Sequence, residues 1–235
     1  LDSLEGSPED SLEVSLVSGD TYIDTPYSGI AVIGKVLVDA GYRVGVIAQP
    51  RLDTAEDISR LGEPNLFWGV SGGTVDSMVS NYTATQKKRR SDDFTPGNLN
   101  DRRPDRAVIV YTNLIKRFFK NSRPIVLGGI EASLRRITHY DYWDDRLRAP
   151  ILFDSKADYL LYGMAENSVL ELAAALQENR SPLAIRGLCY LAKDAPQGYL
   201  LLPSYEECQA EKRSFANMFN VFYRNNDAVT AKGLA

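Results

Sequence analysis

Short apolar runs and helically spaced apolar residues alternate along the first part of the chain. Alternating apolar side chains at 12–18 predict a strand. Residues 29–42 carry apolar side chains at the spacing of one helix face, and Gly41 is a typical helix stop. Residues 43–50 then form a short apolar run that ends in proline, which predicts a second strand. Strand, helix and strand in this order predict a β-α-β unit.

The same alternation continues to residue 186. Apolar runs at 65–73, 124–129 and 157–163 predict three further buried strands. Helices are expected before the first of these strands, at 54–61, and after the first and the third, at 105–118 and 164–179. Five strands with alternating helices favour an α/β fold with a doubly wound, mainly parallel five-stranded sheet, which is a Rossmann-like architecture.

Polar residues indicate how three of the helices begin. Thr54 with Asp57 resembles a capping box, in which a side-chain oxygen accepts from a backbone N–H of the first turn. Ser204 with Glu207 is a second match to this pattern. Asp105 is a suitable N-cap for the helix that follows it.

The pattern changes after Gly187. The runs GLCYLAK and GYLLLPS flank turn residues, which predicts a C-terminal β-hairpin. The helix that Ser204 opens carries an apolar stripe, which consists of Cys208, Phe215, Met218, Phe219 and Phe222. We expect this stripe to be a packing surface, or a surface that a further segment covers, rather than a cofactor site. The chain therefore divides into a tail at 1–11, an α/β domain at 12–186, and a hairpin and helix at 187–235.

Candidate ligand residues follow the predicted strands. In an open parallel sheet, ligands bind at the carboxyl ends of the strands, where glycine turns and helix N-termini present backbone N–H groups. The residues singled out there are Gly19, Asp20, Tyr22, Asp24, Gly72, Gly73, Asp76, Gly128, Gly129 and Glu131. No turn matches the dinucleotide pattern G-x-G-x-x-G or the phosphate loop. The alternative is that the glycines allow tight turns and that Glu131 is an acidic helix start.

The only histidine of the chain lies in the stretch GGIEASLRRITHYDYWDD, which begins at position 128. His139 with Tyr140 and Asp141 could provide a general base or a proton relay. The alternative is structural, with the imidazole and the aromatic rings wedging a loop over the sheet while their polar atoms are hydrogen-bonded. One histidine does not decide between these roles.

One strongly basic cluster lies in the long polar loop expected at 81–103. It consists of Lys87, Lys88, Arg89 and Arg90. Such a cluster could contact the phosphates of RNA or of a nucleotide. Asp92 and Asp93 follow and partly cancel its field, and the net charge of −4 gives no overall attraction to nucleic acid or to an anionic membrane. We therefore expect a solvated or partner-facing loop rather than a nucleic-acid site.

Composition is that of an ordinary globular protein, with 44% hydrophobic and 25% charged residues. Cys189 and Cys208 are too far apart for a C-x-x-C motif, which predicts free thiols in a reducing compartment and no zinc site. No apolar run reaches the roughly 20 residues that span a bilayer, and the first residues are acidic, so we expect a cytoplasmic protein without a membrane partner. The chain starts without Met and ends at AVTAKGLA, so we expect a longer polypeptide.

Four long segments resemble the N-terminal region of the YgiQ-type radical SAM proteins, an uncharacterised bacterial family. These segments are VSGDTYIDTPYSGIAVIGKVLVDAGYRVGVIAQP, LFWGVSGGTVDSMVSNYTATQKKRRSDDFTPG, RPDRAVIVYTNLIKRFF and PIVLGGIEASLRRITHYDYWDDRLRAPILFDSKADYLLYGMAE. Together they cover almost the whole chain and are far more specific than any short motif. The resemblance implies a cobalamin-binding-like α/β domain followed by a radical SAM barrel that holds a [4Fe–4S] cluster and S-adenosylmethionine.

The cluster motif of that family, C-x-x-x-C-x-x-C, is missing from this chain. Cys189 and Cys208 cannot supply three closely spaced thiolates. We therefore expect an accessory domain with no cofactor of its own, which contacts the barrel of the same polypeptide and an unknown substrate. The loops expected to make these contacts lie at 19–29, 71–103 and 128–145.

The loop after the first strand bears on cobalamin. Related cobalamin-binding domains commonly supply a histidine from an Asp-x-His-x-x-Gly loop at this place, whereas residues 19–24 contain no histidine. The sequence therefore argues against His-ligated cobalamin, and binding without a protein ligand stays open. The alternative to an accessory domain is a binding module for a small anionic ligand, for cobalamin or for RNA.

Overall fold

The chain divides into two units, and the computed structural model describes its residues 11–21, 27–227 and 229–235. The first unit comprises Leu1–Arg136 and Ile151–Tyr190. The second comprises Ile137–Pro150 and Leu191–Ala235.

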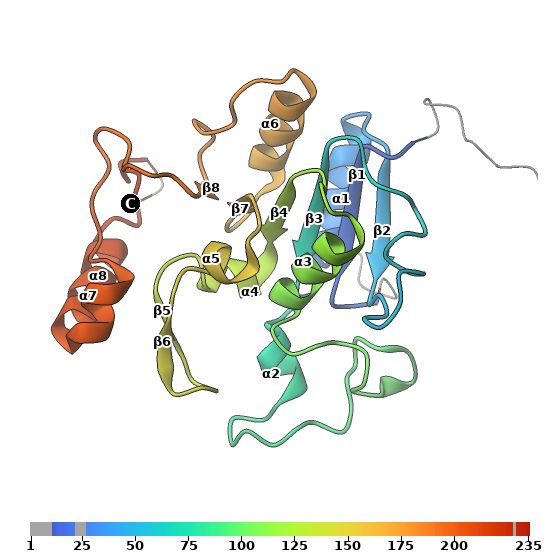
Figure 1. Ribbon diagram of the computed structural model, residues 1–235, viewed down its shortest axis with the longest axis horizontal. Helices are drawn as coiled ribbons and strands as arrows, with labels where there is room; N and C mark the ends of the chain where they lie inside the picture. The colour runs from blue at the N-terminus through green and yellow to red at the C-terminus, as the bar shows by residue number, and fades with distance from the viewer. Residues whose placement is uncertain (1–10, 22–26, 228) are drawn as a thin grey trace, which may run out of the picture. The chain divides into compact units, whose positions relative to one another are not determined.

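A six-stranded sheet forms the body of the first unit (Figure 1). Its strands, in spatial order, are β2 (Val44–Ala48), β1 (Val14–Ser18), β3 (Phe67–Ser71), β4 (Ile125–Gly128), β7 (Tyr159–Leu161) and β8 (Leu188–Tyr190). The first five pair in parallel, and β8 runs antiparallel to β7. The predicted doubly wound, mainly parallel α/β sheet is confirmed, with six strands instead of five.

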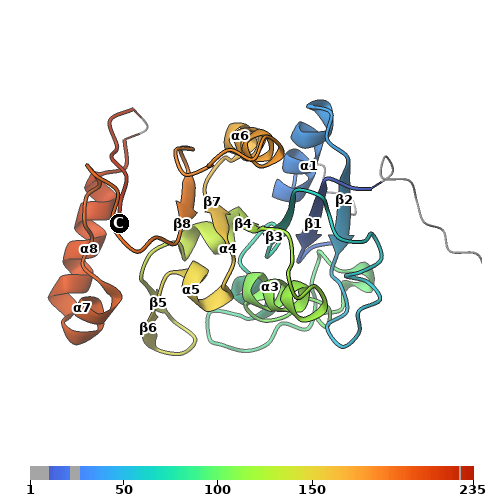
Figure 2. The same cartoon turned by 45° about the horizontal axis from the view of Figure 1, so that its top comes forward.

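Helices cover both faces of this sheet (Figure 2). On one face α1 (Gly29–Asp39) packs against α6 (Glu166–Gln177), and on the other α3 (Ala107–Phe118) packs against α5 (Ile151–Ser155). Two shorter helices, α2 (Ser77–Asn81) and α4 (Gly129–Leu134), follow β3 and β4. No helix among the described residues is long and apolar enough to cross a bilayer.

Two neighbouring residues of β3 pack into two separate hydrophobic cores, one on each face of the sheet. Phe67 packs with Leu16 and Leu172 beneath α1 and α6. Trp68, the next residue along β3, packs with Tyr111 and Leu127 beneath α3 and α5. Successive side chains of a strand point to opposite faces, so continuous apolar runs are what a sheet covered on both faces requires.

The strand order creates a switch point between β1 and β3. After β1 the chain crosses one face through α1 to reach β2, and after β3 it crosses the other face through α3 to reach β4. The helices that follow β1 and β3 therefore lie on opposite faces of the sheet, and open α/β sheets commonly bind ligands at such a point.

The second unit contains a short hairpin and two helices. Strands β5 (His139–Asp141) and β6 (Arg146–Arg148) pair in antiparallel fashion, and α7 (Tyr205–Ala210) packs against α8 (Lys212–Arg224). The capping box predicted for α7 is complete, since Ser204 and Glu207 each accept from the other's backbone N–H. The single helix predicted after Ser204 is interrupted at Glu211, whose backbone is extended.

The strand predicted after Gly187 joins the main sheet instead of forming a hairpin. Leu188–Tyr190 pairs with β7, while Leu200 pairs with Leu234 through an isolated parallel bridge. The open edge of β7 leaves backbone N–H and C=O groups that need partners, and the apolar run after Gly187 satisfies them. Strand β8 therefore lies just past the boundary that we predicted at 186.

The helix predicted at 54–61 is a series of turns. The Asp57 carboxylate accepts from the Arg51 backbone N–H at 2.9 Å instead of completing a capping box. Thr54 Oγ1 is buried without a hydrogen-bond partner among the described residues. The segment therefore lacks the reciprocal bonds on which that prediction depended.

Asp105 does not cap the helix that follows it. Its carboxylate accepts from Asn81 Nδ2 at 2.8 Å and from the Tyr82 hydroxyl at 2.6 Å. Arg106 takes the N-cap position in a left-handed conformation, without a side-chain cap of its own. Helix α3 is therefore capped from elsewhere in the chain.

Two predicted loops contain regular elements. The loop at 81–103 carries the 3₁₀ turn η2 (Pro96–Asn98) and two isolated antiparallel bridges. The stretch at 128–145 divides into α4 and strand β5. Tight local bonding of this kind is weakly encoded in a polar sequence, which explains why the pattern indicated only loops.

A core substitution tests the two-faced sheet. We expect Leu127→Ala to lower the free energy of unfolding by about 2–5 kcal/mol, because a fully buried leucine leaves a cavity. Leu134→Ala is the matched control, since Leu134 is 61% exposed, and we expect it to change stability by less than about 0.5 kcal/mol. Urea unfolding of both variants measures the difference, and equal losses would contradict the assignment.

Candidate functional site

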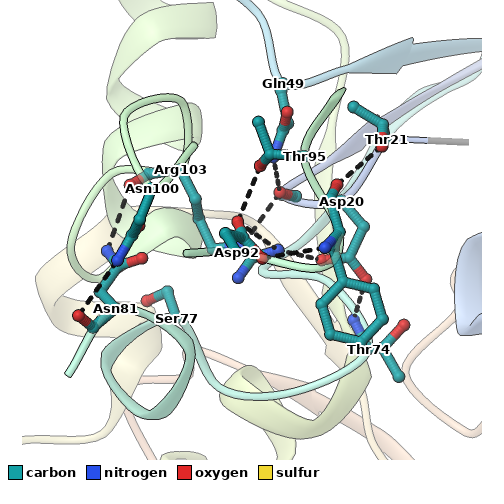
Figure 3. Close-up of polar contacts among 12 residues, drawn as sticks. Asp20, Thr21, Gln49, Thr74, Ser77, Asn81, Asp92, Thr95, Asn100 and Arg103 are labelled. Carbon is teal, nitrogen blue, oxygen red and sulfur yellow. Dashed lines mark hydrogen bonds and ion pairs between the residues drawn. The ribbon is translucent and has the colours of Figure 1, made fainter. Parts of the chain in front are cut away.

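A buried ion-pair cluster lies where β1 and β3 end (Figure 3). Arg103 Nη2 donates to Asp20 Oδ1 at 2.5 Å and lies 3.3 Å from Asp92 Oδ2. The Arg103 side chain is fully buried, and those of Asp20 and Asp92 are 4% and 3% exposed. Arg103 Nε also donates to Gly19 O at 2.9 Å. One guanidinium therefore joins the end of β1 to the long loop before α3.

Asp20 also holds the turn after β3. Its Oδ2 accepts from the Thr74 backbone N–H at 2.5 Å. Gly73 has a φ of +114°, and a Cβ there would lie 2.2 Å from Asp20 Oδ1. A Cβ on Gly19 would lie 2.1 Å from Gly72 O. Only glycine allows the two turns to approach this closely. This agrees with the alternative interpretation of these glycines, in which they allow tight turns.

Gln49 brings the end of β2 into the same cluster. Its Nε2 donates to Gly19 O at 2.9 Å and to Thr95 Oγ1 at 2.7 Å. Thr95 Oγ1 in turn donates to Asp92 Oδ2 at 2.7 Å. Gln49 holds a positive φ of 45°, which is uncommon for a residue other than glycine. Three strand ends and the long loop therefore share one buried hydrogen-bond network.

Phe94 connects the long loop to Thr21, which follows β1. Its backbone carbonyl accepts from both the N–H and the hydroxyl of Thr21, at 3.0 and 2.7 Å. Its N–H donates to Asp92 Oδ1 at 3.0 Å. The Arg103 guanidinium carbon lies 5.7 Å from the centre of the Phe94 ring, within the range of a cation–π contact. The long loop therefore folds over the end of β1.

A second buried carboxylate joins the starts of two helices. Glu131, on α4, accepts from Ser77 N at 2.9 Å and from Val108 N at 3.1 Å. Ser77 Oγ accepts from Ala107 N at 3.0 Å. These bonds satisfy N–H groups in the first turns of α2 and α3, where a negative charge is favourable. Glu131 is therefore the cap that α3 lacks in its own sequence.

Burial raises the pKa of the Glu131 carboxyl, and the nearby Asp76 carboxylate raises it further. The Arg135 guanidinium and the N–H of Ser77 act in the opposite direction. Arg135 Nη1 pairs with Asp76 and also donates to Glu131 O at 3.2 Å. A Cβ on Gly72 would lie 2.3 Å from Glu131 Oε2, so Gly72 is needed for this approach.

Several buried polar atoms around these carboxylates have no hydrogen-bond partner among the described residues. They are Gln49 Oε1, Asn81 Oδ1, Asn100 Oδ1, Arg103 Nη1 and Tyr111 OH. Burial raises the pKa of the Tyr111 hydroxyl, so this phenol stays protonated at neutral pH. Buried polar atoms of this kind commonly bind ordered water.

The structure brings together six of the candidate ligand residues that were predicted at the strand ends, a set called the rim from here on. They are Gly19, Asp20, Gly72, Gly73, Asp76 and Glu131. Gly128 and Gly129 start α4, and Gly129 has a φ of +80°. Tyr22 and Asp24 lie outside the described residues. A ligand role for any of these residues stays a prediction.

The predicted histidine group belongs to the second unit, where it forms β5. The group consists of His139, Tyr140 and Asp141. His139 Nδ1 lies 3.1 Å from Ile137 O, and Asp141 Oδ1 accepts from Trp143 N at 2.9 Å. Asp141 Oδ2 also lies 3.6 Å from Nη1 of Arg148, the residue of β6 that pairs with His139. These are contacts of a hairpin and its turn, and a proton-relay role for His139 stays a prediction.

The basic cluster is exposed on a tight turn. It consists of Lys87, Lys88, Arg89 and Arg90, and Lys88 forms an isolated antiparallel bridge with Tyr82. Arg89 Nε donates to the carbonyls of Val79 and Tyr82 at 3.2 and 3.0 Å. Arg89 therefore stabilises its own turn, while the neighbouring side chains are exposed.

Sequence reasoning missed the residues that complete the network. They are Gln49, Asn81, Thr95, Asn100 and Arg103. Gln49 directly follows a predicted strand, so its position could have placed it at the same sheet edge as Gly19. Arg103 had no such signal, because the composition of a long charged loop does not show which charge folds inward.

Comparison with known proteins assigns the chain to a family. Residues 2–235 match the model described as Radical SAM N-terminal. The chain belongs to the radical SAM N-terminal family. The resemblance predicted from the sequence is therefore confirmed.

This radical SAM N-terminal domain has close relatives of greater length. It is 61% identical over 226 residues to a UPF0313 protein of Fusobacterium nucleatum, covering 96% of this chain and 40% of that protein. It is 53% identical over 208 residues to a UPF0313 protein of Thermotoga maritima, covering 87% of this chain and 36% of that protein. The chain thus spans about two fifths of the length of these curated relatives.

Solved structures share the fold of this radical SAM N-terminal domain. The radical S-adenosylmethionine methyltransferase TsrM from Kitasatospora setae matches with TM-scores of 0.50 and 0.51 at 21% identity. These matches cover 77% and 78% of this chain and 28% and 29% of TsrM. One of the TsrM structures contains cobalamin and a [4Fe–4S] cluster. The likeness shows a shared α/β architecture.

The two thiols of the radical SAM N-terminal domain do not fit a three-thiolate cluster. Cys189 lies in β8, where burial raises the pKa of its thiol to about 11. Cys208 lies in α7 of the second unit, and burial raises its thiol pKa as well. In the part of the chain that the structure describes, no group of three or more His, Cys, Asp or Glu residues could hold a metal ion.

Removing the Arg103 charge tests the stabilising role of the buried ion-pair cluster. We expect Arg103→Met to lower the free energy of unfolding by about 3–5 kcal/mol, because it leaves the buried Asp20 and Asp92 carboxylates uncompensated. Arg51→Met is the matched control, since Arg51 pairs with Asp53 at the surface and such pairs contribute about 0–1 kcal/mol. Urea titration of both variants gives the two losses, and a loss for Arg103→Met as small as the control would rule out this role.

The raised pKa of Glu131 predicts a pH dependence. An acid whose folded pKa lies above its ordinary value of 4.5 contributes stability that is complete below pH 4.5 and is lost as the pH rises through the folded pKa. Glu131→Gln removes this titration, so the stability of the native chain relative to the variant should fall as the pH rises from 4.5 through the folded pKa. Urea midpoints of both proteins across this range measure it, and a difference that rises with pH would contradict the sign.

Proposed function

We propose that this domain is the non-catalytic N-terminal part of a radical SAM enzyme, with the [4Fe–4S] cluster and S-adenosylmethionine held by the remaining chain. The observation that carries the proposal is the family match across 2–235 in a chain that lacks the three-cysteine motif. Relatives more than twice as long provide room for a catalytic domain. The bound cluster supplies the electron that cleaves S-adenosylmethionine in such enzymes.

The domain contributes an ordered rim to this enzyme. Buried bonds fix the segments that follow β1, β2, β3 and β4, because Asp20, Gln49 and Glu131 each join more than one of them or the long loop. Loops on a rigid sheet are suited to positioning a partner surface. We infer that the loops at 19–29, 71–103 and 128–145 contact the catalytic barrel or its substrate.

A ligand-binding module is the second candidate. TsrM binds cobalamin, and its fold resembles this domain. At the switch point of this chain, however, the buried Arg103, Asp20 and Asp92 side chains occupy the space between the strand ends. A ligand there would have to displace a buried ion pair, which argues for the accessory role.

Binding of RNA by the basic cluster and a cytoplasmic location also stay predictions.

Iron analysis tests the proposal. The full-length UPF0313 protein of Fusobacterium nucleatum, purified anaerobically and reconstituted, should hold about four irons per chain and cleave S-adenosylmethionine. The chain of residues 1–235 should hold no stoichiometric iron and cleave nothing, because it has only two, distant thiols. The variant in which Cys189 and Cys208 are both serine should behave in the same way.

Two outcomes would overturn the proposal. One is stoichiometric iron and sulfide in residues 1–235 together with S-adenosylmethionine cleavage. The other is a full-length relative that holds no cluster. Calorimetry of residues 1–235 with cobalamin or ATP addresses the second candidate, because only a binding module predicts saturable heat.

A further inference from the structure

Helix α8 presents an aromatic face to solvent. Phe219 is 54% exposed and Tyr223 is 67% exposed, although both are large and largely apolar. Their rings stack with centroids 6.2 Å apart and an interplanar angle of 18°, and Phe222 lies beside Phe219 at 6.4 Å. Met218, on the buried side, is only 1% exposed. The helix therefore uses one side for its own unit and leaves an ordered aromatic surface on another.

The second unit exposes more large apolar side chains than it buries. Among its described residues, the fully buried hydrophobics are Cys208 and Met218. The exposed large hydrophobics are Tyr140, Tyr142, Leu191, Leu201, Phe219, Tyr223 and Val229. A unit this poor in buried apolar area gains little stability from its own core, and contiguous exposed apolar surface commonly marks an interaction site.

We propose that the α8 aromatic face, made of Phe219, Phe222 and Tyr223, docks against the catalytic part of the same radical SAM polypeptide. This rests on the proposed function. The relatives carry about three fifths of their length beyond the matched region, so a large intramolecular partner is available to each copy of the domain. The family description places the matched region on the N-terminal side of that partner, and α8 is its last helix.

The chemistry of the face suits a permanent contact within one chain. Stacked aromatic rings supply rigid apolar area and are enriched at the centres of protein interfaces. A second copy of the chain is the competing occupant, and the experiment below separates the two.

Hydroxyl-radical footprinting compares the chain of residues 1–235 with the full-length protein from which it derives. In the full-length protein we expect oxidation of Phe219 and Tyr223 to fall several-fold, because the partner covers both rings. Phe153 on α5 is the internal control, since it is 59% exposed and lies in the first unit. Its oxidation should stay unchanged.

Substitution provides a second, independent measurement. Phe219→Ser with Tyr223→Ser should leave the unfolding midpoint of residues 1–235 nearly unchanged, because both rings are mostly exposed there. In the full-length protein the same pair should raise the rate of proteolysis within 191–235 several-fold. Phe153→Ser is the matched control and should leave both proteins as they were.

The outcomes are distinct. Equal oxidation of Phe219 and Tyr223 in both proteins would overturn the docking proposal. Protection that appears in residues 1–235 alone as its concentration rises would assign the face to a second copy and would also overturn it. Iron and sulfide are measured on the same full-length sample. If the cluster is present and α8 is unprotected, docking fails and the proposed function stands, whereas a sample without a cluster fails the proposed function itself.

Discussion

A buried guanidinium between two carboxylates organises the carboxyl ends of the central strands. Arg103 reaches from the loop before α3 to Asp20 at the end of β1 and to Asp92 in its own loop. Inside a protein, an uncompensated charge is far less favourable than at the surface, so each of the three side chains depends on the other two. The long loop is consequently held against the strand ends, where many α/β sheets leave an open crevice.

Close backbone approach makes this arrangement possible. The turns after β1 and β3 lie so near each other that side chains at Gly19, Gly72 or Gly73 would overlap their neighbours. Glu131 extends the same principle to the helices, because one carboxylate satisfies N–H groups at the starts of α2 and α3. The rim is thus a fused set of turns and helix ends rather than a group of independent loops.

The sequence pattern predicted the five parallel strands of the sheet, but it did not predict most of the contacts at the strand ends. Apolar runs such as 65–73 occur because both faces of the strand are buried. A run of this kind can be recognised in the local sequence, so it predicts a strand. The run after Gly187 predicted the strand β8 but not its pairing with β7, because no local pattern records the open edge that β8 joins. Gly19, Asp20 and Glu131 were noticed from their positions after strands, whereas Arg103 becomes a rim residue only through its contact with Asp20, 83 positions away.

That separation has a consequence for synthesis on the ribosome. The first β-α-β unit, which ends with β2 at Ala48, can emerge and pair long before Arg103 is made. Until then the Asp20 carboxylate has no guanidinium and must remain hydrated. The buried ion pair at the end of β1 can therefore form only after the segment through Arg103 has been made.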